Sequence, residues 1–227
     1  MGALLALVVL AGPPVGDPWI DGVLTLGAGV GWVALERSHD DLVDPSCPCE
    51  AGDVAAWERF SIDADVPSAE RLSNLALGVS LVAPGLLVAA TSPDDDWAGD
   101  ALVVYQSVFF AGFLTQISKT AVARPFPYML RDDVTPGQQA DAGNYASMWS
   151  GHTAVPMAAA VSLGVVVSHR HPDAAWRWWV WTLGPALALT TGALQVAAAN
   201  HYPSDVLVGA AVGAGVAALD TWAHGYW

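Results

Sequence analysis

The apolar residues of this chain fall into six long runs separated by polar connections. The runs cover residues 19–35, 73–91, 99–118, 152–168, 177–197 and 206–223. Each approaches the ~17–25 residues that a helix needs to cross the hydrocarbon core of a bilayer. Gly and Ala are frequent in the runs, which suits close helix packing in lipid. The pattern predicts an all-α fold, a polytopic membrane protein with a six-helix transmembrane bundle.

The composition favours this prediction over a soluble helical bundle. Only 13% of the residues are charged and 54% are hydrophobic, whereas a soluble domain carries about 25% charged residues. The net charge is −14, but ten of the 22 acids lie between Glu36 and Glu70. We therefore expect an extramembrane acidic loop at 36–72, with short amphipathic helices near 54–60 and 68–74. The chain has no basic cluster of the kind that binds nucleic acid.

Two features outside the spans have alternative interpretations. Residues 1–18 form an N-terminal apolar segment, either a signal or a short helix, before the six-span domain at 19–227. Cys47 and Cys49, with only Pro48 between them, are either a strained disulfide or two free thiols. Two thiols alone are too few for a structural zinc site.

Polar residues suited to phosphate chemistry recur where spans begin or end. Lys119, the only lysine, closes the third run, and Arg124-Pro125 follows it. Two cations beside a helix end favour an anion site, although Lys119 alone could simply extend to the membrane interface. Because the spans alternate sides, this stretch shares one membrane face with the start of the fourth run and the junction before the sixth.

Ser150-Gly151-His152 opens the fourth run. A helix N-terminus offers free N–H groups and the positive end of its dipole to a phosphate, and glycine allows a close approach. The Ser150 hydroxyl has two roles open to it, donation to a phosphoryl oxygen or capping of the helix. His152 is either a group that exchanges a proton near neutral pH or simply a polar residue at the membrane interface.

His201 and Asp205 lie one helical turn apart at the start of the sixth run. A carboxylate in this position can accept the proton of one ring nitrogen and leave the other as a nucleophile. The alternative is a carboxylate that interacts with the helix dipole near an unrelated histidine.

Taken together, and in this order, these residues resemble the type-2 phosphatidic acid phosphatase family of six-helix membrane lipid phosphatases. Its first motif is Lys, six residues, Arg-Pro; its second is Pro-Ser-Gly-His; its third is Ser-Arg, five residues, His, three residues, Asp. Lys119 matches the first motif, Ser150-Gly151-His152 the second, and His201 with Asp205 the third. The resemblance covers residues ~99–223.

The match departs from the family at both motif arginines. The first falls on Phe126, with Arg124-Pro125 two residues early, and the Ser-Arg pair of the third falls on Leu194-Gln195. Trp149 replaces the proline of the second motif. Since the family's arginines bind phosphate oxygens, their loss can cost several kcal/mol at the transition state. We expect Arg124 to supply one of the missing charges.

The resemblance implies a hydrolase that removes phosphate from a lipid phosphate or lipid pyrophosphate through a phosphohistidine. It assigns His201 as the nucleophile, Asp205 as its orienting carboxylate, and His152 as the acid and base. The phosphate ligands would be Lys119, Arg124, Ser150 and Gly151. No metal or other cofactor is implied, and the partners are the lipid substrate and membrane lipids. The sequence does not specify the oligomeric state.

Several other functions are compatible with parts of this pattern. A weakened or inactive lipid-phosphate binder would explain the missing arginines, and a lipid headgroup phosphotransferase could use the same two histidines. A soluble haloperoxidase relies on the arginines, and a transporter would carry its polar residues near the bilayer midplane rather than at helix ends. Arg170 and Arg177 flank a short loop on the opposite face, which favours the cytoplasm for that face. We expect a bacterial inner-membrane protein whose site faces the periplasm.

Overall fold

The computed structural model describes residues 16–45, 50–93 and 96–227. Residues 1–15, together with Cys47 and Cys49, lie outside the described residues, as do the interpretations placed on them above. Within the described part of the chain every regular element is helical, and no strand is present.

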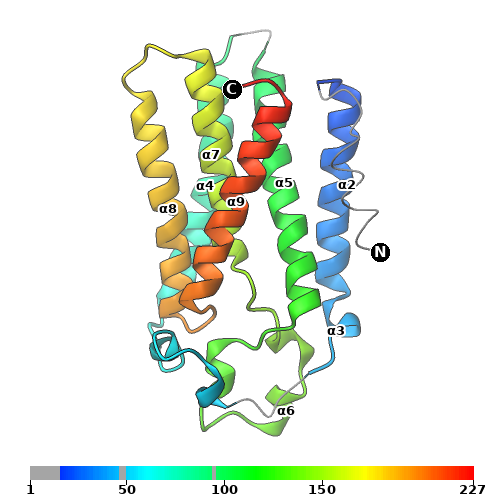
Figure 1. Cartoon of the computed structure of the whole chain (residues 1–227), viewed down its shortest axis with the longest axis vertical. Helices are drawn as coiled ribbons and strands as arrows, with labels where there is room; N and C mark the ends of the chain where they lie inside the picture. Colours follow the sequence, from blue (N-terminus) through cyan, green and yellow to red (C-terminus); the bar gives the residue numbers. More distant parts are fainter. Residues whose placement is uncertain (1–15, 46–49, 94–95) are drawn as a thin grey trace.

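Six long helices form the body of the protein (Figure 1). They are α2 (Pro18–Arg37), α4 (Ala69–Thr91), α5 (Trp97–Val122), α7 (Gly151–Arg170), α8 (Arg177–Ala197) and α9 (Pro203–Ala223). Each is at least 20 residues long, and each contains an 18-residue window with a mean hydropathy of 1.2 or more. Helices of this length and composition fit an integral membrane protein, so the six spans and the all-α fold are confirmed.

Short elements occupy one end of the bundle, in the connections between the spans. They are α3 (His39–Leu42), η1 (Ala51–Asp53), η2 (Arg59–Ser61), η3 (Pro127–Leu130), α6 (Pro136–Gln139) and η4 (Ala142–Asn144). The amphipathic helices expected near 54–60 and 68–74 are not formed as such. The first region holds only the 3-10 turn η2, and most of the second belongs to the first turns of α4, because the helix of that span starts four residues before its apolar run.

Helix α7 is the centre of the bundle. It contacts α4, α5, α8 and α9, and 78% of its apolar window is buried, against 17% for the peripheral helix α2. Its close approach to α9 depends on glycine: a Cβ added at Gly209 would lie 2.6 Å from the Ser150 carbonyl oxygen, and one at Gly213 would meet the Ala154 carbonyl still more closely. This small-residue seam brings the N-termini of α7 and α9 together.

The connections α2–α4, α5–α7 and α8–α9 all lie at the same end of the bundle (Figure 1). This is the arrangement that the alternation of six spans predicts. It gathers the candidate residues at one end and leaves the α4–α5 and α7–α8 connections at the other.

Candidate active site

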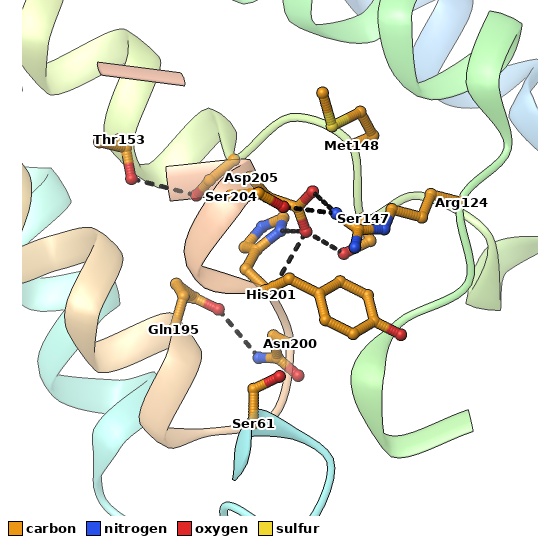
Figure 2. A network of polar contacts seen from close by, with 12 residues as sticks. Ser61, Arg124, Ser147, Met148, Thr153, Gln195, Asn200, His201, Ser204 and Asp205 are labelled. Carbon is orange, nitrogen blue, oxygen red and sulfur yellow. Dashed lines mark hydrogen bonds and ion pairs between the residues drawn. The ribbon is translucent and has the colours of Figure 1, made fainter. Parts of the chain in front are cut away.

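Three segments that are distant in the sequence meet at this end of the bundle: the chain after α5, the chain before α7, and the turn between α8 and α9 (Figure 2). Two direct contacts join the last two segments. Ser147 Oγ donates a hydrogen bond to the Asp205 carboxylate, and the Ser150 N–H donates to the Asp205 backbone carbonyl at 3.1 Å. The predicted residues are therefore built around the first turn of α9.

Asp205 is the most enclosed of these residues, with a fully buried side chain. Its Oδ2 accepts from Ser147 Oγ at 2.5 Å and from the Tyr202 N–H at 2.9 Å, while its Oδ1 accepts from Arg124 at 2.6 Å. Donors to a charged acceptor form the stronger class of hydrogen bond. Three of them fix the orientation of this carboxylate.

His201 lies beside Asp205, with Nδ1 at 3.6 Å from Asp205 Oδ2. This distance permits an ion pair but exceeds that of a hydrogen bond, and Nδ1 is buried without a hydrogen-bond partner. The residue is only 3% exposed, and the Phe126 ring packs edge-on against the imidazole. Because Nδ1 faces Asp205, Nε2 is the nitrogen left for chemistry.

The surroundings of His201 favour its neutral form. Burial lowers the pKa of His201, and the positive charge of Lys119 lowers it further, while the Asp205 carboxylate acts to raise it. Burial is the largest effect, so the pKa lies below its ordinary value. A neutral imidazole keeps the lone pair that a nucleophile needs.

Ser150 and His152 stand at the N-terminus of α7, as predicted. Ser150 is the residue preceding the first turn, yet its side chain caps no backbone N–H. Its Oγ is fully buried and accepts from Thr153 Oγ1 at 3.2 Å. The capping alternative is therefore not what the structure shows. The N-terminal N–H groups of α7, including that of Gly151, point toward the same end of the bundle as the α9 N-terminus.

His152 has a partner that the sequence did not suggest. Its Nε2 lies 2.8 Å from Oδ1 of Asn74, in the second turn of α4. An amide oxygen accepts a hydrogen bond, so this contact favours the proton on Nε2 and leaves the lone pair on Nδ1. Asn74 therefore orients the His152 ring and favours the tautomer that is protonated on Nε2.

Lys119 occupies the last turn of α5 and makes no hydrogen bond or ion pair with any described residue. Its positive charge lowers the pKa of His201, and the last turn of α5 lies at the same end of the bundle as the α8–α9 turn (Figure 1). A lysine without a counter-charge in contact is available to an anionic ligand.

Arg124 is already occupied by acidic side chains. After the left-handed residue Ala123 ends α5, the guanidinium bonds Asp205 Oδ1 at 2.6 Å and lies 3.3 Å from Glu58, and it stacks over the Tyr202 ring at 3.8 Å. Figure 2 shows Arg124 and His201 on opposite sides of the Asp205 carboxylate. The expected role of Arg124 as a phosphate ligand stays a prediction, and the hydrogen bonds of its guanidinium are with two carboxylates and the Ser204 hydroxyl.

The position that the resemblance assigns to the second arginine carries Gln195, which is 2% exposed. Its Nε2 donates to Ser73 Oγ at 3.0 Å, and its Oε1 accepts from Asn200 at 2.9 Å. Both ends of the amide are thus engaged, and Gln195 ties α4 to the turn that carries the nucleophile candidate.

Sequence reasoning did not single out Asn74, Ser147 or Glu58. Asn74 is a polar residue at the start of an apolar run, which was the one available signal. Ser147 and Glu58 lie in loops, and their partners are 58 and 66 or more residues away. Such contacts depend on how loops fold over the bundle, which local patterns do not encode.

Two further features bear on ligands. Among residues 16–45, 50–93 and 96–227, no group of three or more His, Cys, Asp or Glu side chains could hold a metal ion. An apolar cavity of about 600 Å³ lies between α4, α7 and α8. It begins near Pro156, one helical turn from His152, and extends to Leu163 and Trp176 toward the opposite end.

Comparison with known proteins gives one positive result. The family model described as PAP2 superfamily matches residues 100–227, which is more than half of the chain. No curated protein and no solved structure gives a match.

Proposed function

Since the chain belongs to the PAP2 superfamily, we propose that it is a membrane-bound hydrolase that removes phosphate from a lipid phosphate or lipid pyrophosphate. Membership itself supports a phosphatase-type activity. The lipid substrate and the phosphohistidine intermediate are our proposals. The observation that carries them is the enclosed His201 beside an oriented carboxylate, with Lys119 at the same end of the bundle and without a polar contact in the described residues.

In the first step His201 Nε2 attacks phosphorus, and the bond from phosphorus to the leaving oxygen breaks. Protonated His152 gives its proton to that oxygen, so the alcohol or phosphate leaves as a neutral or less charged species. Asp205 stabilises the positive charge that develops on the His201 imidazole. Lys119, the Ser150 hydroxyl and the Gly151 N–H hold the phosphoryl oxygens, and α7 directs its positive dipole end at them.

In the second step a water molecule attacks the phosphohistidine. His152, now neutral, takes a proton from the water, the P–N bond breaks, and inorganic phosphate is released. His201 and His152 then have their starting protonation states. These residues need no redox partner or co-reactant other than water.

The apolar cavity supports a lipid as the substrate class. Apolar side chains of α4, α7 and α8 form most of its lining, and it starts at Pro156, one helical turn further along α7 than His152. A headgroup at the α7 N-terminus would leave its hydrocarbon chain free to follow this groove along the bundle. We place the protein in a bacterial inner membrane with this end facing the periplasm, on the basis of Arg170 and Arg177 at the other end.

The test is phosphate release by the purified protein in detergent, with phosphatidate and a long-chain isoprenyl pyrophosphate as substrates. We expect turnover on at least one of them. Trapping of a ³²P label on His201, lost in His201→Ala, would establish the intermediate. An inactive wild type across both lipid classes would contradict the proposal.

One observation favours a second candidate, a weakened or inactive lipid-phosphate binder. Arg124 forms ion pairs with two carboxylates, and Gln195 is hydrogen bonded to uncharged side chains. Such a protein would bind phosphatidate without forming phosphohistidine, so the trapping experiment separates the two. An added alcohol acceptor in the same assay would reveal headgroup transfer as a phosphorylated alcohol.

A further inference from the structure

A chain of charged side chains links the extramembrane acidic loop to the candidate nucleophile. Glu58 Oε2 lies 3.3 Å from Arg124, Arg124 bonds Asp205 Oδ1 at 2.6 Å, and Asp205 Oδ2 faces His201 Nδ1 at 3.6 Å. Each link uses a different atom of its residue, so the four groups are arranged in series. Figure 2 shows the three inner members of this series.

We propose that Arg124 is a positioning residue that acts on His201 through the Asp205 carboxylate, and that Glu58 sets how strongly it does so. The proposal rests on the proposed function for the role of His201. It gives the acidic loop a defined influence on catalysis, through one residue that reaches into the site.

Glu58 is built into the protein rather than placed on its surface. Its side chain is only 6% exposed, although its neighbours Trp57 and Phe60 are 55% and 62% exposed. Its Oε1 accepts from the Ser204 N–H at 2.9 Å, at the N-terminus of α9. A carboxylate buried between two exposed aromatic residues indicates a specific contact, because exposure would otherwise be the cheaper state of a charged group.

The loop around Glu58 is also fastened to the site. Arg131 donates to the carbonyl oxygens of Ile62 and Ala64, both at 2.7 Å. Ile62 belongs to an apolar cluster with Val54 and Tyr202, and Tyr202 is the neighbour of His201. The position of Glu58 is thus determined by the same contacts that cover the α8–α9 turn.

The charges fix the sign of each effect. A positive charge on Arg124 offsets the negative charge of Asp205 and so weakens the support that Asp205 gives to a protonated His201. Glu58 offsets Arg124 and restores part of that support. The other charged or titratable groups that face His201 are Lys119 of α5 and His152 of α7, and neither contacts Arg124 or Glu58 in the described structure.

The experiment compares Arg124→Gln with Glu58→Gln. Both variants leave neighbouring hydrogen bonds in place. In Arg124→Gln, Asp205 keeps its donors Ser147 Oγ and the Tyr202 N–H, and in Glu58→Gln the side-chain amide keeps an oxygen for the Ser204 N–H. The His201 imidazole is titrated directly by NMR on ¹⁵N-histidine-labelled protein in detergent, and the acid limb of kcat/KM is measured in parallel.

We expect opposite shifts. Arg124→Gln should raise the titration midpoint of His201 by about one pH unit, and Glu58→Gln should lower it by about half a unit. The acid limb of kcat/KM should move in the same directions. The matched control is Asp53→Asn, which removes an exposed acid of the same loop and should shift neither measurement.

Dependence on Asp205 is tested in an Asp205→Asn background, by NMR alone. There the shift caused by Arg124→Gln should fall to less than half. An undiminished shift, or shifts of the same sign in the two single variants, would overturn the proposal. If Arg124→Gln does not fold, the test rests on Glu58→Gln: a His201 titration midpoint lower than that of Asp53→Asn supports the proposal, and an equal or higher midpoint overturns it. An inactive wild type with the expected NMR shifts would instead contradict only the proposed function.

Discussion

Each end of the bundle contains an arginine paired with a fully buried aspartate, and the two pairs differ in what surrounds them. At the end away from the site, Arg170 binds Asp100 with two nitrogens, at 2.9 and 3.0 Å. Asp100 also accepts from Ser92 Oγ at 2.6 Å and from the Tyr226 hydroxyl at 2.5 Å. Burial and the neighbouring Asp100 carboxylate raise the pKa of Tyr226, so the phenol keeps this proton.

The pair at the site end is incomplete by comparison. Asp205 is fully hydrogen bonded, but the adjacent His201 Nδ1 is buried without a partner, and Lys119 has no polar contact within the described residues. Buried polar groups in proteins are usually satisfied. The closed cluster around Asp100 therefore stabilises the fold, whereas Lys119, at the same end as Asp205, keeps its ammonium group available for an anionic ligand.

The largest expected effect is that of the nucleophile. His201→Ala should reduce phosphate release by at least about 10,000-fold, because no other group can form the covalent intermediate. The thermal unfolding midpoint should change little. His169→Ala is the matched control, a histidine at the opposite end that packs on Tyr226, and it should keep activity within about twofold. Equal loss in both variants would show that the two ends do not differ as described.

The closed cluster should show the reverse behaviour. Asp100→Asn leaves Arg170 without its buried counter-charge, so we expect a loss of about 3 kcal/mol in the free energy of unfolding. The kcat of the folded fraction should stay within about twofold. Asp96→Asn removes a 48%-exposed partner of the same arginine and should cost less than about 1 kcal/mol. Unfolding curves of the detergent-solubilised variants, with activity per folded molecule, decide the matter.

Asn74 should have a smaller effect that is confined to the proton-transfer step. Asn74→Ala frees the His152 ring and should lower kcat about tenfold through misplacement of the acid. Asn74→Asp keeps the acceptor and adds a negative charge that stabilises the imidazolium, so the alkaline limb of kcat should move to higher pH. Thr91→Ala, which loses one side-chain bond within α4 at the opposite end of the bundle, serves as the control. An unchanged pH profile in Asn74→Asp would argue for a purely structural role.

The smallest expected effect is a displacement of the acid limb in the pH profile of the wild-type protein. Since His201 must be neutral to attack and its pKa lies below the ordinary value of 6.5, the acid limb of kcat/KM should fall below pH 6.5. The sign follows from burial, which disfavours the charged imidazolium and so extends the neutral form to lower pH. A pH profile on one lipid phosphate tests this, and a limb above 6.5 would contradict it.

Much of the architecture could be predicted from local patterns. Apolar runs of membrane-spanning length gave the six helices to within a few residues, because a bilayer imposes length and polarity on each segment independently. The alternation of spans placed Lys119, His152 and His201 at one end before any contact was known. The start of α4 was predicted four residues late, since its first turn is polar and lies outside the apolar run.

The partners of these residues were decided by tertiary structure alone. Each of these contacts joins residues 66 or more positions apart in the sequence. They are the pairing of Arg124 with Asp205 and Glu58, the contact of Asn74 with His152, and the bond of Gln195 to Ser73. The sequence by itself determined which residues could do phosphate chemistry and on which face they stand. Tertiary structure alone determined which charged side chains are paired and which are unpaired. It did so through the packing of α7 against α9 at Gly209 and through the fold of the acidic loop over the N-termini of these helices. The physical reason is that side-chain pairing depends on distances that no local pattern specifies.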